Sequence, residues 1–187
     1  MRAAVMARVA LMAALTAVGA QISIPLYFTP VPFTLQVPMV VLSGLLLGAR
    51  YGALAQVVYL LLGAVGLPVF AQFRGGLGTL LGPTGGYLIS YPLAAAIAGL
   101  AFGVVASGRR GRAIAGGTAF GLLGLLVIYG IGAAWLAVQS GLSAGEAITA
   151  GVLPFVPFDV VKVVLAALLA AAVAPQISAL GAPRRSV

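Results

Sequence analysis

Long apolar runs, interrupted by short segments rich in Gly, Pro and Arg, make up most of the chain. Several runs reach the roughly 17 to 25 residues with which a helix crosses a bilayer, and none shows the strict alternation of membrane-barrel strands. We therefore predict an all-α integral membrane protein, a six-transmembrane-helix bundle that forms one membrane domain over residues 1–187. The predicted helices cover residues 5–24, 35–49, 51–67, 84–106, 114–140 and 157–174.

The breaks between these runs contain the residues that end helices. The segment IPLYFTPVPF at 24–33 has three prolines and predicts a stiff extended loop that could cover a pocket. The segment GAR at 48–50 predicts a sharp turn, residues 72–83 are glycine-rich, and SGRRGR at 107–112 is basic.

Composition narrows the class of protein further. With 63% hydrophobic and 6% charged residues, the chain fits a bilayer protein that has little mass outside the membrane. It has no Cys and no His, which excludes disulfides, thiol nucleophiles, imidazole bases and the usual zinc sites. It also lacks a G-x-x-x-x-G-K-[ST] motif. We therefore predict no Walker-type ATPase, no metal and no cofactor, and we expect any energy source to lie on another chain.

The basic residues follow the positive-inside rule. With six spans both termini lie on one side, and most of the ten Lys and Arg residues fall on that side. Arg74 falls on the opposite side, and Lys162 falls inside the last span. We predict cytoplasmic termini, location in the cytoplasmic membrane, and no nucleic-acid partner, because topology accounts for the basic excess. The residues on the cytoplasmic side are Arg2, Arg8, Arg50, Arg109, Arg110, Arg112, Arg184 and Arg185.

The first segment has a second interpretation. MRAAVMARVALMAALTAVGAQ has a basic start, an apolar stretch and a V-G-A ending that is compatible with secretory cleavage after Ala20. Cleavage would leave five spans. We favour the retained span, because the segment is long enough to cross the membrane and the arginine distribution fits with it in place.

The first predicted helix has small residues at four-residue spacing. Ala10 with Ala14, and Ala13 with Ala17, form the small-xxx-small pattern that lets membrane helices approach closely. Packing within the chain is one explanation. A partner helix in the membrane is the other.

The last apolar run contains the acid Asp159 and the chain's single lysine, Lys162. Pro157 suits the first helical position, which would put Asp159 in the first turn, where the helix dipole favours an anion. Lys162 lies about one turn deeper, where that dipole disfavours a cation, so it either extends to the interface or faces a polar cavity. We favour the cavity, because a charge near the bilayer centre costs roughly 2.5–3.5 kcal/mol.

Further polar, aromatic and glycine residues fall on the same side of the membrane as Asp159. Glycines there allow the backbone to approach a ligand, and the aromatic residues are either interfacial anchors or pocket walls. The candidates for a substrate site are Phe28, Gln36, Phe73, Arg74, Gly75, Gly76, Thr84 and Tyr87.

Four stretches of the chain resemble a known family. They are similar, and occur in the same order along the chain, to stretches of the BioY-type S components of energy-coupling-factor (ECF) vitamin transporters, which bind biotin. The stretches are FTPVPFTLQ (28–36), LLLGAVGLPVFA (60–71), GGLGTLLGPTGGYL (75–88) and LPFVPFDVVKVVLAALLA (153–170).

The resemblance implies the S-component fold, with a biotin site near the extracellular face and capped by the loop between the first two helices. It also implies that Asp159 and Lys162 bind the ligand and that Tyr87 and residues 73–78 form the other side of the site. The implied partners are biotin, an ECF transmembrane coupling subunit and ATPase subunits. The small-residue positions implied to contact the coupling subunit are Ala10, Ala13, Ala14 and Ala17.

Other functions remain open at this point. The S-component architecture serves several vitamins, so the ligand could be a different one. An ion-coupled secondary transporter would use Asp159 and Lys162 as a titrating pair. An intramembrane enzyme is disfavoured, because the chain lacks a nucleophile paired with a base.

Overall fold

The structure of the chain, a computed structural model, describes residues 3–181. Over this range eight α-helices are joined by short loops, a 3-10 helix and an antiparallel two-stranded ribbon. The elements are α1 (Ala3–Gln21), β1 (Ser23–Ile24), β2 (Phe33–Thr34), α2 (Gln36–Ala64), η1 (Ala71–Phe73), α3 (Leu77–Leu80), α4 (Gly85–Gly99), α5 (Phe102–Val105), α6 (Arg110–Ser140), α7 (Ala144–Gly151) and α8 (Val156–Gly181).

Four helices, α1, α2, α6 and α8, are long and apolar enough to cross a membrane. The membrane-protein class is thus confirmed, whereas a count of six helices is not. The predicted helix 84–106 is divided into α4 and α5. Neither α3 nor α7 was predicted, because each is too short to produce a long apolar run.

Helix α2 joins the predicted helices 35–49 and 51–67, yet it is not straight. Gly48 has φ 79° and ψ 171°, which breaks the helix. Ser43 Oγ accepts a hydrogen bond of 2.6 Å from Gln56 Nε2, although a straight helix would separate residues 13 apart by about 20 Å. The two halves therefore fold back on each other at the predicted GAR turn. A Cβ added to Gly52 would lie 2.7 Å from Gly44 Cα, so glycine permits this close crossing.

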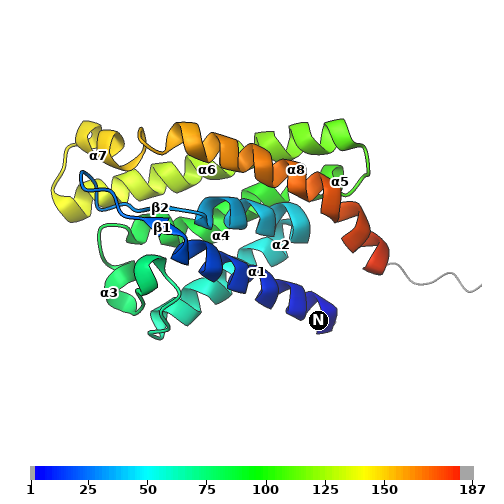
Figure 1. The fold of residues 1–187 in the computed structure, drawn as a ribbon, viewed down its shortest axis with the longest axis horizontal. Helices are drawn as coiled ribbons and strands as arrows, with labels where there is room; N and C mark the ends of the chain where they lie inside the picture. The colour runs from blue at the N-terminus through cyan, green and yellow to red at the C-terminus, as the bar shows by residue number, and fades with distance from the viewer. Residues whose placement is uncertain (1–2, 182–187) are drawn as a thin grey trace, which may run out of the picture.

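Figure 1 shows α6 and α8 lying lengthwise beside each other, with α1 and α2 below them. The folded-back α2 packs against α1, α4 and α8, and α6 packs against α4, α7 and α8. The start of α1 and the end of α8 lie at one end of the bundle, together with the turn between α5 and α6 (Figure 1). The β1–β2 loop and α7 lie at the opposite end, where the pocket described below is found.

Helix α1 is a packed element of this bundle, which favours the retained span over a cleaved leader. Val9, Met12 and Thr16 are buried against its neighbours, and Gln56 Nε2 donates to Thr16 Oγ1 at 3.1 Å. This contact joins α1 to α2 inside the apolar core, where a paired polar group also specifies how the two helices align.

The small-residue positions on α1 lie on two different faces. Ala10 and Ala14 are exposed, so they are available to a partner helix. Ala13 is only 1% exposed and belongs to the core, and Ala17 is partly buried and packs against that core. The assignment of Ala13 to a partner contact is therefore wrong, because its side chain already packs inside the chain.

Several residues of the charge-based topology prediction fall outside the description. Arg2, Arg184 and Arg185 lie outside residues 3–181. Arg8, Arg50 and the cluster at 109–112 are described.

Candidate functional site

A pocket with about 770 Å³ of empty space opens at the end of the bundle where the β1–β2 loop and α7 lie. This volume includes the open mouth of the pocket, and the site is a cleft lined by apolar and polar groups together, as small-molecule sites usually are. Segments from nearly the whole chain meet there, including the proline-rich loop, the loop around η1 and the first turns of α2, α4 and α8. The proline-rich segment contributes Pro30, Val31 and Pro32, as predicted for a loop that covers a pocket.

One side of the pocket is formed by side chains on β2, α6 and α8. Asp159 and Lys162 form an ion pair of 2.8 Å across one helical turn and are only 4% and 9% exposed. Tyr129 OH donates to Asp159 Oδ2 at 2.8 Å, and Lys162 Nζ donates to the backbone oxygen of Thr34 at 2.7 Å. We call Thr34, Tyr129, Asp159 and Lys162 the charged wall.

The start of α8 explains this placement. Asp159 lies in the first turn of α8, and its N–H donates to the carbonyl of Phe155 at 2.8 Å. The side chain of Lys162 is buried and does not extend to the protein surface. It reaches β2 instead, and its ammonium lies 3.6 Å from the ring centroid of Phe33. The prediction of a polar cavity is confirmed by this burial, and the cation gains a π contact besides its two hydrogen bonds.

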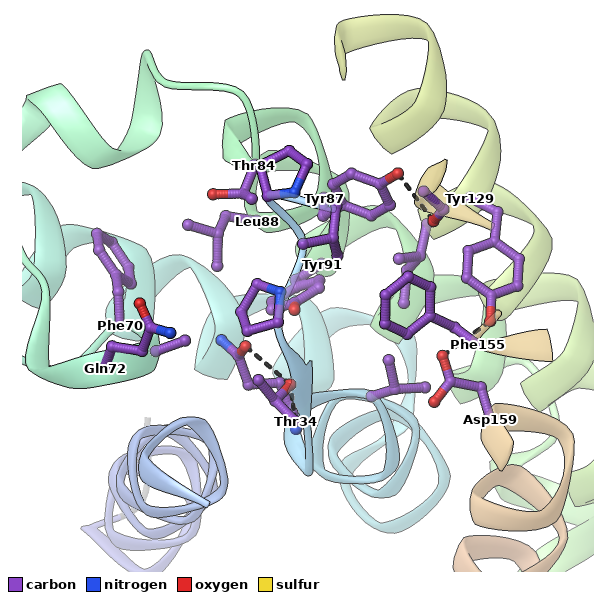
Figure 2. Close-up of a pocket in the computed structure, with 18 of the residues that line it drawn as sticks. Thr34, Phe70, Gln72, Thr84, Tyr87, Leu88, Tyr91, Tyr129, Phe155 and Asp159 are labelled. Atoms are coloured by element: carbon purple, nitrogen blue, oxygen red, sulfur yellow. Dashed lines mark hydrogen bonds between the residues drawn. The ribbon is translucent and has the colours of Figure 1, made fainter. Parts of the chain in front are cut away.

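The opposite side of the pocket is mainly loop backbone. Phe70 and Gln72 lie on one side of the cavity, and Tyr129 and Asp159 lie across it (Figure 2). Phe70 is buried and meets Tyr59 edge-to-face at 5.5 Å. Phe70 N donates to Arg74 O at 2.9 Å, which closes a tight loop. We call Phe70, Ala71, Gln72 and Arg74 the loop wall.

Tyrosines from α4 line the space between these walls. Tyr87 OH donates to the carbonyl of Gly151 at 2.9 Å, so its hydroxyl hydrogen is already used (Figure 2). Tyr87 therefore presents a ring and an acceptor oxygen to the pocket. Tyr91 also lines the cavity and stacks with Tyr59 at a centroid distance of 6.5 Å.

Gln36 occupies the base of the pocket at the start of α2. Its Nε2 donates to Tyr59 OH at 2.7 Å, and that hydroxyl donates to the carbonyl of Val69 at 3.1 Å. Its Oε1 accepts from Thr34 Oγ1 at 3.1 Å. Gln36 thus connects a residue of the charged wall with the segment that leads into the loop wall.

Six predicted site residues come together around the pocket, and four do not. Phe28 and Phe73 are 66% and 71% exposed and do not line it. Gly75 and Gly76 flank the loop wall without lining the cavity. A Cβ at Gly75 would be too close to Leu67 O, so that glycine serves backbone packing. The six that line the pocket are Gln36, Arg74, Thr84, Tyr87, Asp159 and Lys162.

The lining residues that the sequence analysis missed include Gln72, Tyr91, Tyr129 and Phe155. The signal for Tyr129 was present, because a tyrosine in the middle of an apolar span needs a partner for its hydroxyl. No local pattern marks Gln72, whose side chain enters the site through an unusual backbone conformation.

The site carries few charges and they do not cancel. Of the residues that line it in the described part of the chain, Asp159 is an acid and Lys162 and Arg74 are bases. Their formal sum is positive by one charge, which favours a ligand with a single negative charge. The hydrogen-bonded charges and the rings around them are groups that can bind a small polar ligand.

Comparison with known proteins identifies the family. A model of the BioY family matches residues 1–179. The chain belongs to the BioY family. It is 48% identical over 170 residues to a probable biotin transporter of Pyrococcus horikoshii, covering 91% of this chain and 96% of that one. It is also 48% identical over 157 residues to the biotin transporter of Thermotoga maritima, covering 84% and 88%.

A solved structure supports the same assignment. The crystal structure of the S component for biotin from an ECF-type ABC transporter superimposes with a TM-score of 0.82 at 29% identity, covering 90% of this chain and 89% of that one. The resemblance inferred from the four sequence stretches is thus confirmed at the level of the family. With its apolar helices, the chain is a multi-pass membrane protein of this family.

Proposed function

We propose that this chain is the substrate-capture subunit of a biotin uptake system and that the pocket between the charged wall and the loop wall is its binding site. The observation that carries the proposal is the buried Asp159–Lys162 pair, which lines the pocket together with the tyrosines of α4 and α6. A buried pair is weak evidence for stability alone, because desolvation can exceed the attraction between the charges. A ligand that uses the pair supplies the missing reason for it.

The chemistry of biotin matches these groups. Its ureido ring offers two N–H donors and a carbonyl, the sulfur-containing ring fused to it is apolar, and its side chain ends in one carboxylate. Asp159 accepts hydrogen bonds, Lys162 and Arg74 attract a carboxylate, and the tyrosine rings of α4 suit the bicycle. The net positive charge of the lining residues agrees with a monoanionic ligand.

We further propose a topology of six spans with cytoplasmic termini. In chain order the six spans are α1, the two halves of α2, α4, α6 and α8. This topology opens the pocket to the outside and places the basic turn between α5 and α6 inside. The exposed Ala10 and Ala14 would contact a transmembrane coupling subunit, and separate ATPase subunits would supply the energy.

Calorimetric titration of the purified chain in lipid nanodiscs tests the ligand. Biotin, desthiobiotin, thiamine and riboflavin are titrated separately, and Trp135 fluorescence provides a second signal. We expect tight binding of biotin and none of thiamine or riboflavin. Tight binding of another vitamin would replace biotin as the substrate. Absence of binding by folded protein, combined with uptake that follows a proton or sodium gradient, would favour an ion-coupled transporter instead.

A further inference from the structure

The segment that forms the loop wall has two consecutive residues in an unusual backbone conformation, one in the wall and one between two of its members. Gln72 has φ 61° and ψ 35°, and Phe73 has φ 56°. These are the non-glycine residues with positive φ in the described part of the chain. Left-handed conformations are uncommon for such residues and persist when the surrounding structure holds them. A specific contact should therefore fix this turn.

That contact comes from Gln21, the last residue of α1. Its Oε1 accepts from the backbone N–H of Phe73 at 3.0 Å, and its Nε2 lies 3.2 Å from the carbonyl oxygen of Phe70. One amide thus binds the backbone on both sides of the strained turn. Nε2 also lies 3.2 Å from the carbonyl oxygen of Ala17, which fixes the amide against its own helix, and 3.4 Å from that of Pro68.

The contact spans a long distance in sequence and ends at the pocket. Gln21 and Phe73 are separated by 52 residues. The two residues that flank Phe73, Gln72 and Arg74, line the cavity, whereas Gln21 itself does not. Gln21 therefore affects the ligand only through the shape of the loop wall.

We propose that Gln21 is a positioning residue that holds the loop wall closed over the bound ligand and so slows ligand release. The identity of the ligand in this proposal rests on the proposed function. The contact of Gln21 with the loop does not depend on that function. Without the amide, Phe73 and Gln72 relax toward ordinary negative φ, and the pocket side of the loop turns away from the cavity. Because Gln21 ends α1, a tilt of α1 would also move the loop wall.

The substitution Gln21→Leu tests this role, because leucine is of similar size and has no amide. In nanodiscs, stopped-flow displacement of labelled biotin gives the dissociation rate, and hydrogen exchange of the ligand-free chain reports on the amides of residues 69–75. We expect dissociation to be about tenfold faster, the association rate to be nearly unchanged and exchange in the loop to rise. Gln139→Leu is the matched control, since Gln139 is exposed on α6 and does not line the pocket, and it should change neither quantity.

A second substitution separates positioning from general stability. Asparagine adopts positive φ more readily than phenylalanine, so Phe73→Asn added to Gln21→Leu should slow dissociation again. Wild-type dissociation and exchange in Gln21→Leu would overturn the proposal, and so would faster dissociation that Phe73→Asn does not reduce. If the leucine variant does not fold, the same two measurements are made on Gln21→Glu. This variant keeps an acceptor for the N–H of Phe73 but loses the N–H donors to the carbonyl of Phe70. If the wild-type chain binds no biotin, the proposed function fails, while loop exchange still decides the role of Gln21.

Discussion

The charged wall and the loop wall face each other across one pocket, but they hold their polar groups in different ways. In the charged wall, side chains on α6 and α8 satisfy one another and the backbone of β2 over distances of 2.7–2.8 Å. In the loop wall, the backbone turns through left-handed residues, and one amide from α1 bonds it at Phe70 and Phe73, besides the backbone bond between Phe70 and Arg74. Groups fixed on helices are well suited to recognition, whereas a turn held by one side chain is suited to movement.

The sharpest test of the charged wall removes the lysine. In Lys162→Met, the carboxylate of Asp159 stays buried with Tyr129 as its remaining side-chain partner. Breaking such a pair costs about 3 kcal/mol, so we expect biotin affinity to fall at least about a hundredfold and the melting temperature to fall as well. Calorimetry and thermal unfolding of the nanodisc-bound chain measure both.

A double variant shows whether the pair serves the fold or the ligand. Asp159→Leu combined with Lys162→Met replaces both charges by apolar groups of similar size, which is often neutral or stabilising. We expect the melting temperature to recover while biotin affinity stays at least as low as in Lys162→Met. Recovery of both would contradict the assignment of the charged wall to the ligand.

Removal of the tyrosine hydroxyl is expected to have a smaller effect. Tyr129→Phe keeps the ring and deletes the 2.8 Å hydrogen bond to Asp159 Oδ2. Hydrogen bonds to charged groups contribute roughly 1.5–3 kcal/mol, so affinity should fall about tenfold or more. Tyr27→Phe is the control, because Tyr27 is fully exposed and does not line the pocket. Unchanged affinity in Tyr129→Phe would show that the ligand does not depend on the orientation of Asp159.

The same contrast explains what the sequence could predict. Asp159 and Lys162 were identified because charges within an apolar run are costly and need a reason. The GAR turn was identified because glycine permits the conformation that Gly48 adopts. In contrast, Gln72 and Phe73 take positive φ against their intrinsic preference, and the cause is a glutamine 52 residues away from Phe73. A tertiary contact of this kind leaves no local pattern in the sequence.

Local sequence patterns also did not predict which face of a helix packs against its neighbours. The alanines of α1 repeat at one spacing, yet Ala13 is in the core and Ala10 is exposed. Which face of a helix meets its neighbours depends on the folded-back α2, and the alanine spacing is compatible with either face. The described chain has more helices than the six predicted for a related reason, since α3 and α7 are too short to be recognised as spans.

The smallest effect is expected in the loop wall at Arg74. This residue lines the pocket, is exposed and forms no ion pair in the described part of the chain. An exposed charge is screened by salt, so we expect Arg74→Gln to lower biotin affinity about threefold at low ionic strength and hardly at all at high ionic strength. Titration of biotin over a range of salt concentrations measures this, and biotin methyl ester, which has no carboxylate charge, should bind the variant and the wild type equally. A large loss of biotin affinity that does not depend on salt would mean that Arg74 is desolvated when the ligand binds. The loop wall would then take part in ligand recognition, as the charged wall does, and the two walls would differ less in function than in structure.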